Sequence, residues 1–215
     1  MRAKALGYGV VLLLVIASIV MQMSLPASDG SRFATIVLQA VTLVVAIRAA
    51  GVRGGTRLAA LVAVVAVIAS TITWVVRGDL PPAPAAIVNG LLVAVAPVAI
   101  ARALLRDLRA QHEVTTATLA GVLAIYLLAG MFFSFLYGVI GAVDSDALFA
   151  EIATSNRQDQ LYFSFVTLCT VGYGDLTPAG GLARSCSVAE MLAGQIYLVT
   201  IVSLIVSNLG AARRR

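Results

Sequence analysis

The sequence predicts an all-α integral membrane protein, and three observations lead to that fold class. Hydrophobic residues make up 60% of the 215 residues, and charged residues make up only 12%. The mean hydropathy of +1.00 is far above that of ordinary soluble domains. About six apolar stretches approach the roughly 20 helical residues that cross a bilayer. These stretches consume nearly the whole chain and leave little room for a folded domain outside the membrane.

Charged residues, glycine or proline bound each apolar stretch. The stretches cover residues 7–23, 33–50, 58–76, 83–105, 115–143 and 182–209. Residues 144–181 are too polar to cross a bilayer, yet they carry a short apolar patch at 161–171. This pattern predicts a re-entrant segment, whose non-helical backbone must be buried in protein or line water. We expect a domain of four transmembrane helices over 1–109 and a second domain over 110–215, made of an outer helix, a re-entrant helix and an inner helix.

The basic residues predict the orientation of the chain, because short cytoplasmic loops are enriched in lysine and arginine. Alternate loops and ends differ strongly in this respect. One set holds Arg2, Lys4, Arg48, Arg53, Arg57, Arg102, Arg106, Arg109, Arg213, Arg214 and Arg215; the other holds Arg32, Arg77, Arg157 and Arg184. We therefore expect both termini to be cytoplasmic, an even number of spans, and a re-entrant segment that enters from outside. The terminal arginines are expected to lie against anionic lipid.

The first apolar stretch has a second interpretation. Arg2 and Lys4 ahead of it also fit a secretory signal peptide, with Ala27 as the edge of a cleavage site. Leu25 is a poor residue for such a site and the stretch is long, which favours a retained helix.

Other classes of function find little support. The net charge of +5 is scattered over the ends of apolar stretches, so no nucleic acid partner is predicted. No nucleophile, phosphate loop or metal cluster is recognisable, so we predict neither an enzyme nor a cofactor. Cys169 and Cys186 are expected to be free. Arginine outnumbers lysine, which suggests a bacterial protein of the plasma membrane.

The residues at 170–175 read TVGYGD and follow a short helix expected at 161–169. A potassium ion leaves water only where oxygens replace its hydration shell, and carbonyls that all face one axis provide rings of oxygens when four chains meet. Gly172 and Gly174 permit the backbone conformations that such a stretch requires. The Thr170 hydroxyl adds one more oxygen, and Val171 and Tyr173 are free to pack outward.

These residues, together with Thr167, resemble the signature of the potassium-channel pore superfamily, and the resemblance covers about residues 115–209. It implies a homotetramer that conducts K⁺ passively in single file. Its site residues would be Thr170, Val171, Gly172 and Tyr173 for K⁺ coordination, with Thr167, Gly174 and Asp175 as support. The tripeptide at 7–9 is also GYG, but no preceding helix, Thr or following Asp accompanies it.

Three residues of the inner helix are further candidates. Gly194 matches the position of a gating hinge in that superfamily, although a small residue for close helix packing explains it equally well. Gln195 is expected to face a water-filled cavity. Glu190 is an intramembrane carboxyl group that could form a hydrogen bond behind the filter or lie near the outer interface.

Voltage sensing is not favoured by the sequence. Arg102, Arg106 and Arg109 follow the apolar part of the fourth stretch, where cytoplasmic arginines are expected in any case. The second and third stretches contain no acidic countercharge. Pro97 and Asn89 instead suggest a kinked, tightly packed scaffold helix. His112 could sense cytoplasmic pH, although a lone loop histidine is more often incidental.

Acidic residues are expected to concentrate cations at the outer mouth. They are Asp144, Asp146, Glu151, Asp159 and Asp175. Two alternatives stay open at this stage: a poorly selective cation channel, and a nonconducting scaffold or sensor that retains the filter fold. No gating stimulus follows from the sequence.

Overall fold

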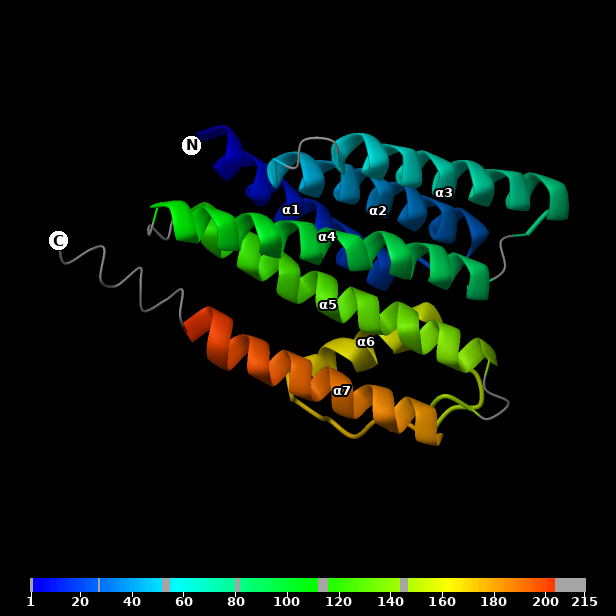
Figure 1. Ribbon diagram of the computed structural model, residues 1–215. Helices are drawn as coiled ribbons and strands as arrows, with labels where there is room; N and C mark the ends of the chain where they lie inside the picture. Colours follow the sequence, from blue (N-terminus) through cyan, green and yellow to red (C-terminus); the bar gives the residue numbers. More distant parts are fainter. Residues whose placement is uncertain are drawn as a thin grey trace.

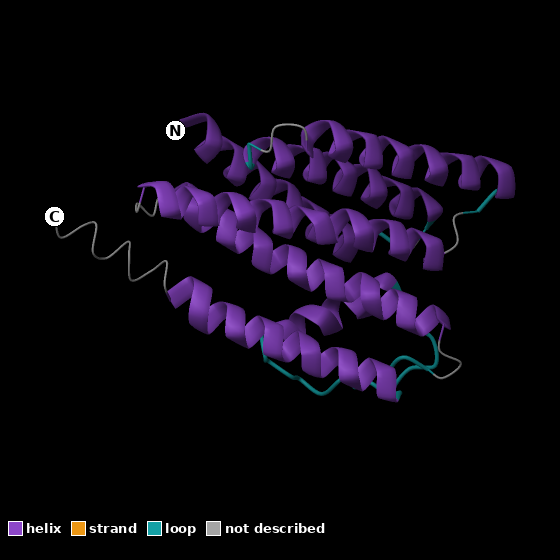
Figure 2. Cartoon of the chain, in the orientation of Figure 1, coloured by secondary structure: helices purple, strands orange, loops and turns teal. Residues whose placement is uncertain are grey.

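A computed structural model describes residues 2–26, 28–51, 55–79, 82–111, 116–143 and 147–203. Every regular element within these ranges is a helix, as Figure 2 shows. The helices are α1 Arg2–Ser24, α2 Asp29–Ala49, α3 Gly55–Arg77, α4 Pro82–Gln111, α5 Thr116–Val143, α6 Arg157–Leu168 and α7 Gly181–Tyr197, followed by a π-helical turn Leu198–Val202.

Within the described residues, four helices contain apolar segments long enough to cross a membrane. The segments are Gly7–Ser24, Asp29–Ala49, Pro84–Leu104 and Thr118–Val143. The apolar part of α3 is shorter, Leu61–Arg77. Helix α7 continues through the π-helical turn to Ser203, and the end of the sixth predicted stretch, 204–209, lies outside the described residues. The all-α membrane fold is confirmed.

Helices α2 and α4 both extend beyond their predicted stretches. Helix α2 begins at Asp29 rather than at residue 33, because the Ser28 hydroxyl accepts a hydrogen bond from the Ser31 backbone amide and the Ser31 hydroxyl accepts one from the Ser28 backbone amide. This capping box adds a first turn that is too polar to be recognised from hydropathy. Asp29 within that turn is paired with Arg32 at 2.7 Å. Helix α4 runs beyond residue 105 to Gln111, so Arg106 and Arg109 belong to the helix backbone.

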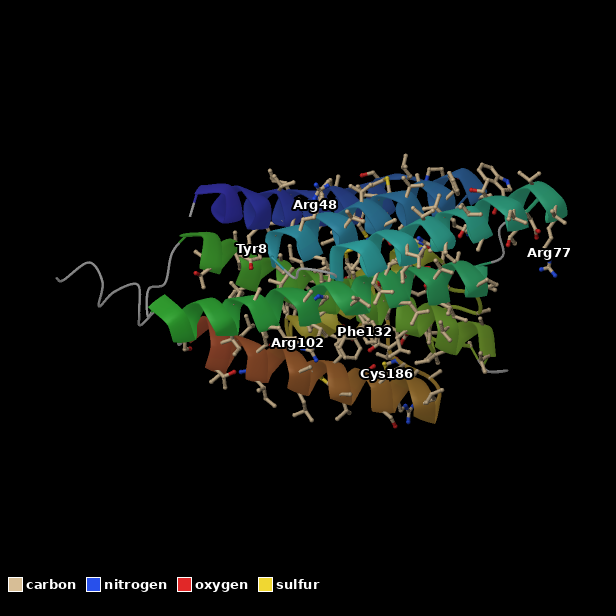
Figure 3. The ribbon with its side chains drawn as sticks, turned by 45° about the horizontal axis from the view of Figure 1, so that its top comes forward. Tyr8, Arg48, Arg77, Arg102, Phe132 and Cys186 are labelled. Carbon is tan, nitrogen blue, oxygen red and sulfur yellow. The ribbon has the colours of Figure 1, made fainter. Side chains whose placement is uncertain are left out.

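Successive long helices run in alternating directions (Figure 1). Helices α1, α3 and α5 begin at the end marked N, and α2, α4 and α7 begin at the opposite end. Arg77 accordingly lies at one end of the bundle, and Arg48 and Arg102 lie toward the other (Figure 3). Helix α5 ends where α7 begins, so the chain between them leaves and returns on the same side.

Helix α6 lies between α5 and α7 in this returning segment (Figure 1). Its 12 residues extend about 18 Å, which is too short for a hydrocarbon core of about 30 Å. Helix α5 is the centre of the packing, since α1, α4, α6 and α7 all contact it. Ile36, Leu92, Ile100 and Leu128 are among the fully buried side chains of this core.

A polar contact also crosses the interior between the first two helices. Gln39 of α2 is buried and donates a hydrogen bond to the Ser18 hydroxyl of α1 at 2.8 Å. Gln22 of α1 donates to the same hydroxyl at 3.3 Å. Buried amides need such partners in an apolar environment, so the contact fixes the register of the two helices.

Candidate ion-conduction site

The re-entrant helix α6 begins at a capping box. The side chain of Asn156 accepts hydrogen bonds from the backbone amides of Gln158, at 2.7 Å, and Asp159, at 3.1 Å. The Asp159 carboxylate in turn accepts a hydrogen bond from the backbone amide of Asn156 at 2.8 Å. These contacts satisfy orphan amides of the first turn and place a negative charge at the positive end of the helix dipole. Asp159 therefore has a structural role in helix capping, and its contribution to negative charge at an outer mouth stays a prediction.

The end of α6 is a Schellman motif. The Thr170 amide donates to the Thr167 carbonyl at 3.0 Å, and the Val171 amide donates to the Val166 carbonyl at 2.9 Å. The residue that turns the chain in this motif adopts a left-handed conformation and is usually glycine. Here it is Thr170, with a φ of 57°. A side chain in this region costs about 1–2 kcal/mol, so the first residue of the TVGYGD segment is held in a strained conformation.

The TVGYGD segment continues with alternating backbone conformations. Gly172 and Gly174 have φ values of 57° and 78°, whereas Val171 and Tyr173, which precede them, have negative φ. Alternation of positive and negative φ lets carbonyls that would otherwise point to opposite sides point the same way. The two glycines occupy positions where other residues would be strained. The segment therefore has the alternation in the sign of φ that a row of aligned carbonyl oxygens requires.

Comparison with known proteins covers this same region. Residues 121–210 match the family described as "Ion channel". Two pore potassium channel c of Oryza sativa subsp. japonica is 47% identical over 49 residues, which are 23% of this chain and 11% of that protein. Inward rectifier potassium channel Kirbac3.1 of Paramagnetospirillum magnetotacticum is 32% identical over 84 residues, 39% of this chain and 27% of that protein. Protein LctB of Bacillus caldotenax is 33% identical over 102 residues, 44% of this chain and 75% of that protein.

The chain belongs to the potassium-channel pore superfamily. In the terms of that superfamily, α5 is the outer helix, α6 the pore helix, residues 170–175 the filter and α7 the inner helix. The chain spans only 11% and 27% of the two potassium channels named above, so the likeness covers a small part of each of them.

The outer end of the filter is tied to the pore helix. The Tyr162 hydroxyl donates to the Asp175 carboxylate at 2.6 Å, and the rings of Tyr162 and Tyr173 stack with centroids 6.4 Å apart. Val171 is 51% exposed and Tyr173 is 70% exposed on a single chain. Within a single chain, these two side chains therefore lack most of the packing contacts that the sequence predicts for them.

The chain beyond the filter pairs with the loop that precedes the pore helix. Phe149 and Pro178 form an antiparallel bridge. Glu151 accepts hydrogen bonds from the Thr177 amide at 2.7 Å and from the Thr177 hydroxyl at 2.5 Å. These bonds hold the pKa of Glu151 below its ordinary value. Glu151 therefore stabilises the loop in addition to adding negative charge outside the filter.

Glycines let the pore helix approach both neighbouring helices. A Cβ atom on Gly130 of α5 would lie 2.8 Å from the Phe165 ring. A Cβ atom on Gly194 of α7 would lie only 2.4 Å from the carbonyl oxygen of Leu168, the last residue of α6. This contact gives Gly194 a packing reason, whereas its role as a hinge stays a prediction. Tyr126 of α5 donates to the same Leu168 carbonyl at 3.1 Å.

Glu190 lies in the same region and is completely buried. Its carboxyl oxygens contact the Ser164 hydroxyl of the pore helix at 2.5 Å and the Tyr137 hydroxyl of the outer helix at 2.7 Å. Ser164 also donates to the Gly130 carbonyl at 2.6 Å. Glu190 therefore lies at the meeting point of α5, α6 and α7.

The remaining predicted residues are distributed as follows. Thr167 is buried on the pore helix, and Gln195 is exposed on a single chain. Cys169 and Cys186 are free, as predicted. Arg102 is exposed on α4. Asp144, Asp146, His112, Ala27 and Arg213–Arg215 lie outside the described residues, as do the side chains of Arg106 and Arg109.

Several residues that hold the pore helix were missed by the sequence analysis. Ser164 and Tyr137 are partners of Glu190, and Gln158 donates from the first turn of α6 to the Met23 carbonyl of α1 at 2.9 Å. The sequence signal for such residues is a polar group within an apolar helix, because a buried polar group needs a hydrogen-bond partner. That signal identifies Ser164 as a candidate but does not identify its partner.

Proposed function

We propose that this chain is one subunit of a homotetrameric channel of the bacterial plasma membrane that conducts K⁺ selectively and passively. Carbonyls of Thr170, Val171, Gly172 and Tyr173, with the Thr170 hydroxyl, would replace the hydration shell of the ion. The observation that carries this proposal is the alternation of positive φ at Thr170, Gly172 and Gly174 within residues 121–210, which match the ion-channel family.

A fourfold assembly is supported by what a single chain leaves uncovered. One chain supplies one quarter of each carbonyl ring, and its filter residues 170–175 are all exposed. Val171 and Tyr173 line an open hollow of about 310 Å³ together with Leu161, Phe165 and α1 residues. An apolar hollow of this kind beside a filter suits side chains of a neighbouring subunit.

The alternating helices support a topology with both termini in the cytoplasm. Arginines at the N-marked end of the bundle outnumber those at the opposite end, which also carries the start of the pore helix. The positive-inside rule then assigns the filter entrance to the outer face.

The packing of α4 argues against a voltage sensor. Gly121 of α5 approaches Leu104 of α4 closely, since a Cβ there would lie 3.2 Å from a Leu104 methyl group. Asn89 of α4 is fully buried and donates to the Ala85 carbonyl at 2.9 Å. Small residues that let helices approach closely mark a packed helix interface in membranes, whereas the bond of Asn89 stays within α4. A helix packed in this way would have to break its contact with α5 before its arginines could move.

Flux from liposomes that contain the purified full chain tests the proposal. We expect entry of thallium and K⁺ without entry of Na⁺. The variant Gly174→Ala should abolish this flux, because its φ of 78° strains any side chain. Gly9→Ala is the matched control from the N-terminal GYG tripeptide, where an added Cβ meets nothing within 4 Å, and it should retain the flux. Equal flux of Na⁺ and K⁺ would support a poorly selective channel, and no flux at any voltage, pH or membrane tension would support a nonconducting scaffold. Either result would overturn the proposal.

A further inference from the structure

The oxygens around Glu190 form a closed set of short contacts within one subunit. Glu190 lies 2.5 Å from the Ser164 hydroxyl and 2.7 Å from the Tyr137 hydroxyl. The Ser164 oxygen lies 2.6 Å from the Gly130 carbonyl oxygen. The Ser187 oxygen lies 2.9 Å from the carbonyl oxygen one turn earlier in α7 and 3.2 Å from the Tyr137 oxygen. Each of the shorter contacts needs one hydrogen between its two oxygens.

The hydrogens can be counted from the chemistry of the groups. A carbonyl only accepts, so the single hydrogen of Ser164 must point to Gly130. The Ser164 oxygen can then only accept at its 2.5 Å contact with Glu190. An ionised carboxylate has no hydrogen to give, whereas a protonated carboxyl group has one. Tyr137 supplies the hydrogen on the other Glu190 oxygen, and Ser187 supplies its own to its carbonyl. A protonated Glu190 therefore satisfies all four of the shorter contacts.

The ionised alternative leaves one contact unsatisfied. Ser164 would have to donate to Glu190, and its oxygen would face the Gly130 carbonyl oxygen at 2.6 Å with no hydrogen between them. Two oxygen lone pairs repel at that distance. An ionised Glu190 would also be a fully buried charge. A buried carboxylate without a neighbouring cation is strongly disfavoured because its charge loses the solvation of water.

Neighbouring groups supply no compensating positive charge. From α5, the titratable groups near Glu190 are Tyr137 and Tyr126, and from α7 the nearest is Cys186. Helix α6 presents Ser164. Among the described residues, no lysine, arginine or histidine forms an ion pair with Glu190.

We infer that Glu190 is protonated at neutral pH and works as a neutral hydrogen-bond donor that positions the pore helix. Its proton goes to Ser164, whose own proton goes to Gly130, so one chain of hydrogen bonds joins α7, α6 and α5. Ser164 lies six residues before Thr170, which makes Glu190 a positioning residue for the filter. This inference rests on the proposed function.

Substitutions of Glu190 can show whether this residue acts as a neutral hydrogen-bond donor or as an ionised carboxylate. In Glu190→Gln the amide nitrogen can donate to Ser164 while the amide oxygen accepts from Tyr137, so both contacts persist. We expect E190Q to retain K⁺ flux and K⁺ over Na⁺ selectivity. Glu190→Ala removes both contacts, and its flux should fall by about tenfold or more, as expected when a buried group loses its partner. If E190Q loses flux as E190A does, the residue acts as a carboxylate and the inference is wrong.

An infrared measurement tests the proton independently of conduction. The wild-type protein in liposomes at pH 7 should show a carbonyl stretch of a protonated carboxyl group that shifts in D₂O and is missing from E190Q. The absence of this band in the wild type would overturn the inference, even in a chain that conducts K⁺. Conversely, a wild type that shows the band but passes no K⁺ would overturn only the proposed function.

Discussion

Replacement of Gly194 by alanine tests whether the inner helix and the pore helix must touch at this point. The added Cβ atom would lie 2.4 Å from the Leu168 carbonyl oxygen, and Cβ atoms essentially never approach a heavy atom within 3.0 Å. The end of the pore helix and α7 must therefore separate by about 0.6 Å. Leu168 is two residues before Thr170, so the shift reaches the inner end of the filter directly.

The free-energy cost follows from two opposing effects. Overpacking of this kind costs about 1–3 kcal/mol per subunit. Alanine is favoured over glycine within a helix by about 0.5–1 kcal/mol, which offsets part of the cost. The obstructing atom belongs to the backbone, which cannot rotate away as a side chain would. We therefore expect G194A to be less stable than the wild type in each of its subunits.

Two measurements distinguish packing from a hinge. We expect a lower unfolding temperature of the purified protein and a reduced ratio of thallium to sodium flux in G194A. Gly181→Ala is the control on the same helix, because its added Cβ meets nothing within 4 Å. A hinge would instead change the open probability while stability and selectivity stayed constant. If G194A matches both the wild type and G181A in unfolding temperature and flux ratio, the packing argument is refuted.

Three further substitutions test contacts at the outer side. Gln158→Leu removes the donor to the Met23 carbonyl, so amide hydrogen exchange should become faster at the end of α1 and the start of α6, while the unfolding temperature changes little. Tyr162→Phe removes the donor to Asp175, so single-channel openings should become shorter; unchanged open times would contradict a role for this bond in holding the filter. Glu151 has a lowered pKa, so its stabilisation is present above the ordinary carboxyl pKa and is lost as pH falls through its own lowered value. The unfolding temperature of the wild type should therefore fall more than that of Glu151→Gln between pH 7 and a pH below about 4, and equal falls in both proteins would count against this contact.

Local patterns in the sequence were sufficient for the helices and for the glycine positions of the filter. Hydropathy identifies an apolar helix because nearly every residue of it contributes to the signal. The positive φ values at Gly172 and Gly174 occur at residues whose chemistry permits them. The left-handed Thr170 was not foreseeable in this way, because threonine is an uncommon residue for a Schellman turn. Two hydrogen bonds hold this conformation. The Thr167 carbonyl accepts from the Thr170 amide, and the Val166 carbonyl accepts from the Val171 amide.

Contacts between distant parts of the chain could not be read from the sequence. Ser164 and Glu190 are separated by 26 positions, and Tyr137 and Glu190 by 53. Gln158 and Met23 are 135 positions apart. A single polar residue in an apolar helix indicates that some partner is needed, but helix packing decides which one. The missing information was therefore the angle and depth at which the pore helix lies between its neighbours.

The contacts of the pore helix also bear on the purpose of the first four helices. Helix α1 belongs to the N-terminal part of the chain, yet it packs on α5 and α6, and its last carbonyls accept hydrogen bonds from Gln158. Helix α4 packs along α5 as well. Helices from both sides of the predicted domain boundary between residues 109 and 110 therefore pack against one another. An N-terminal unit that held the pore helix only through a linker could move without disturbing the filter. Here a movement of α1 would break the hydrogen bonds that Gln158 donates at the start of α6, so we predict that a displacement of α1 alters the filter.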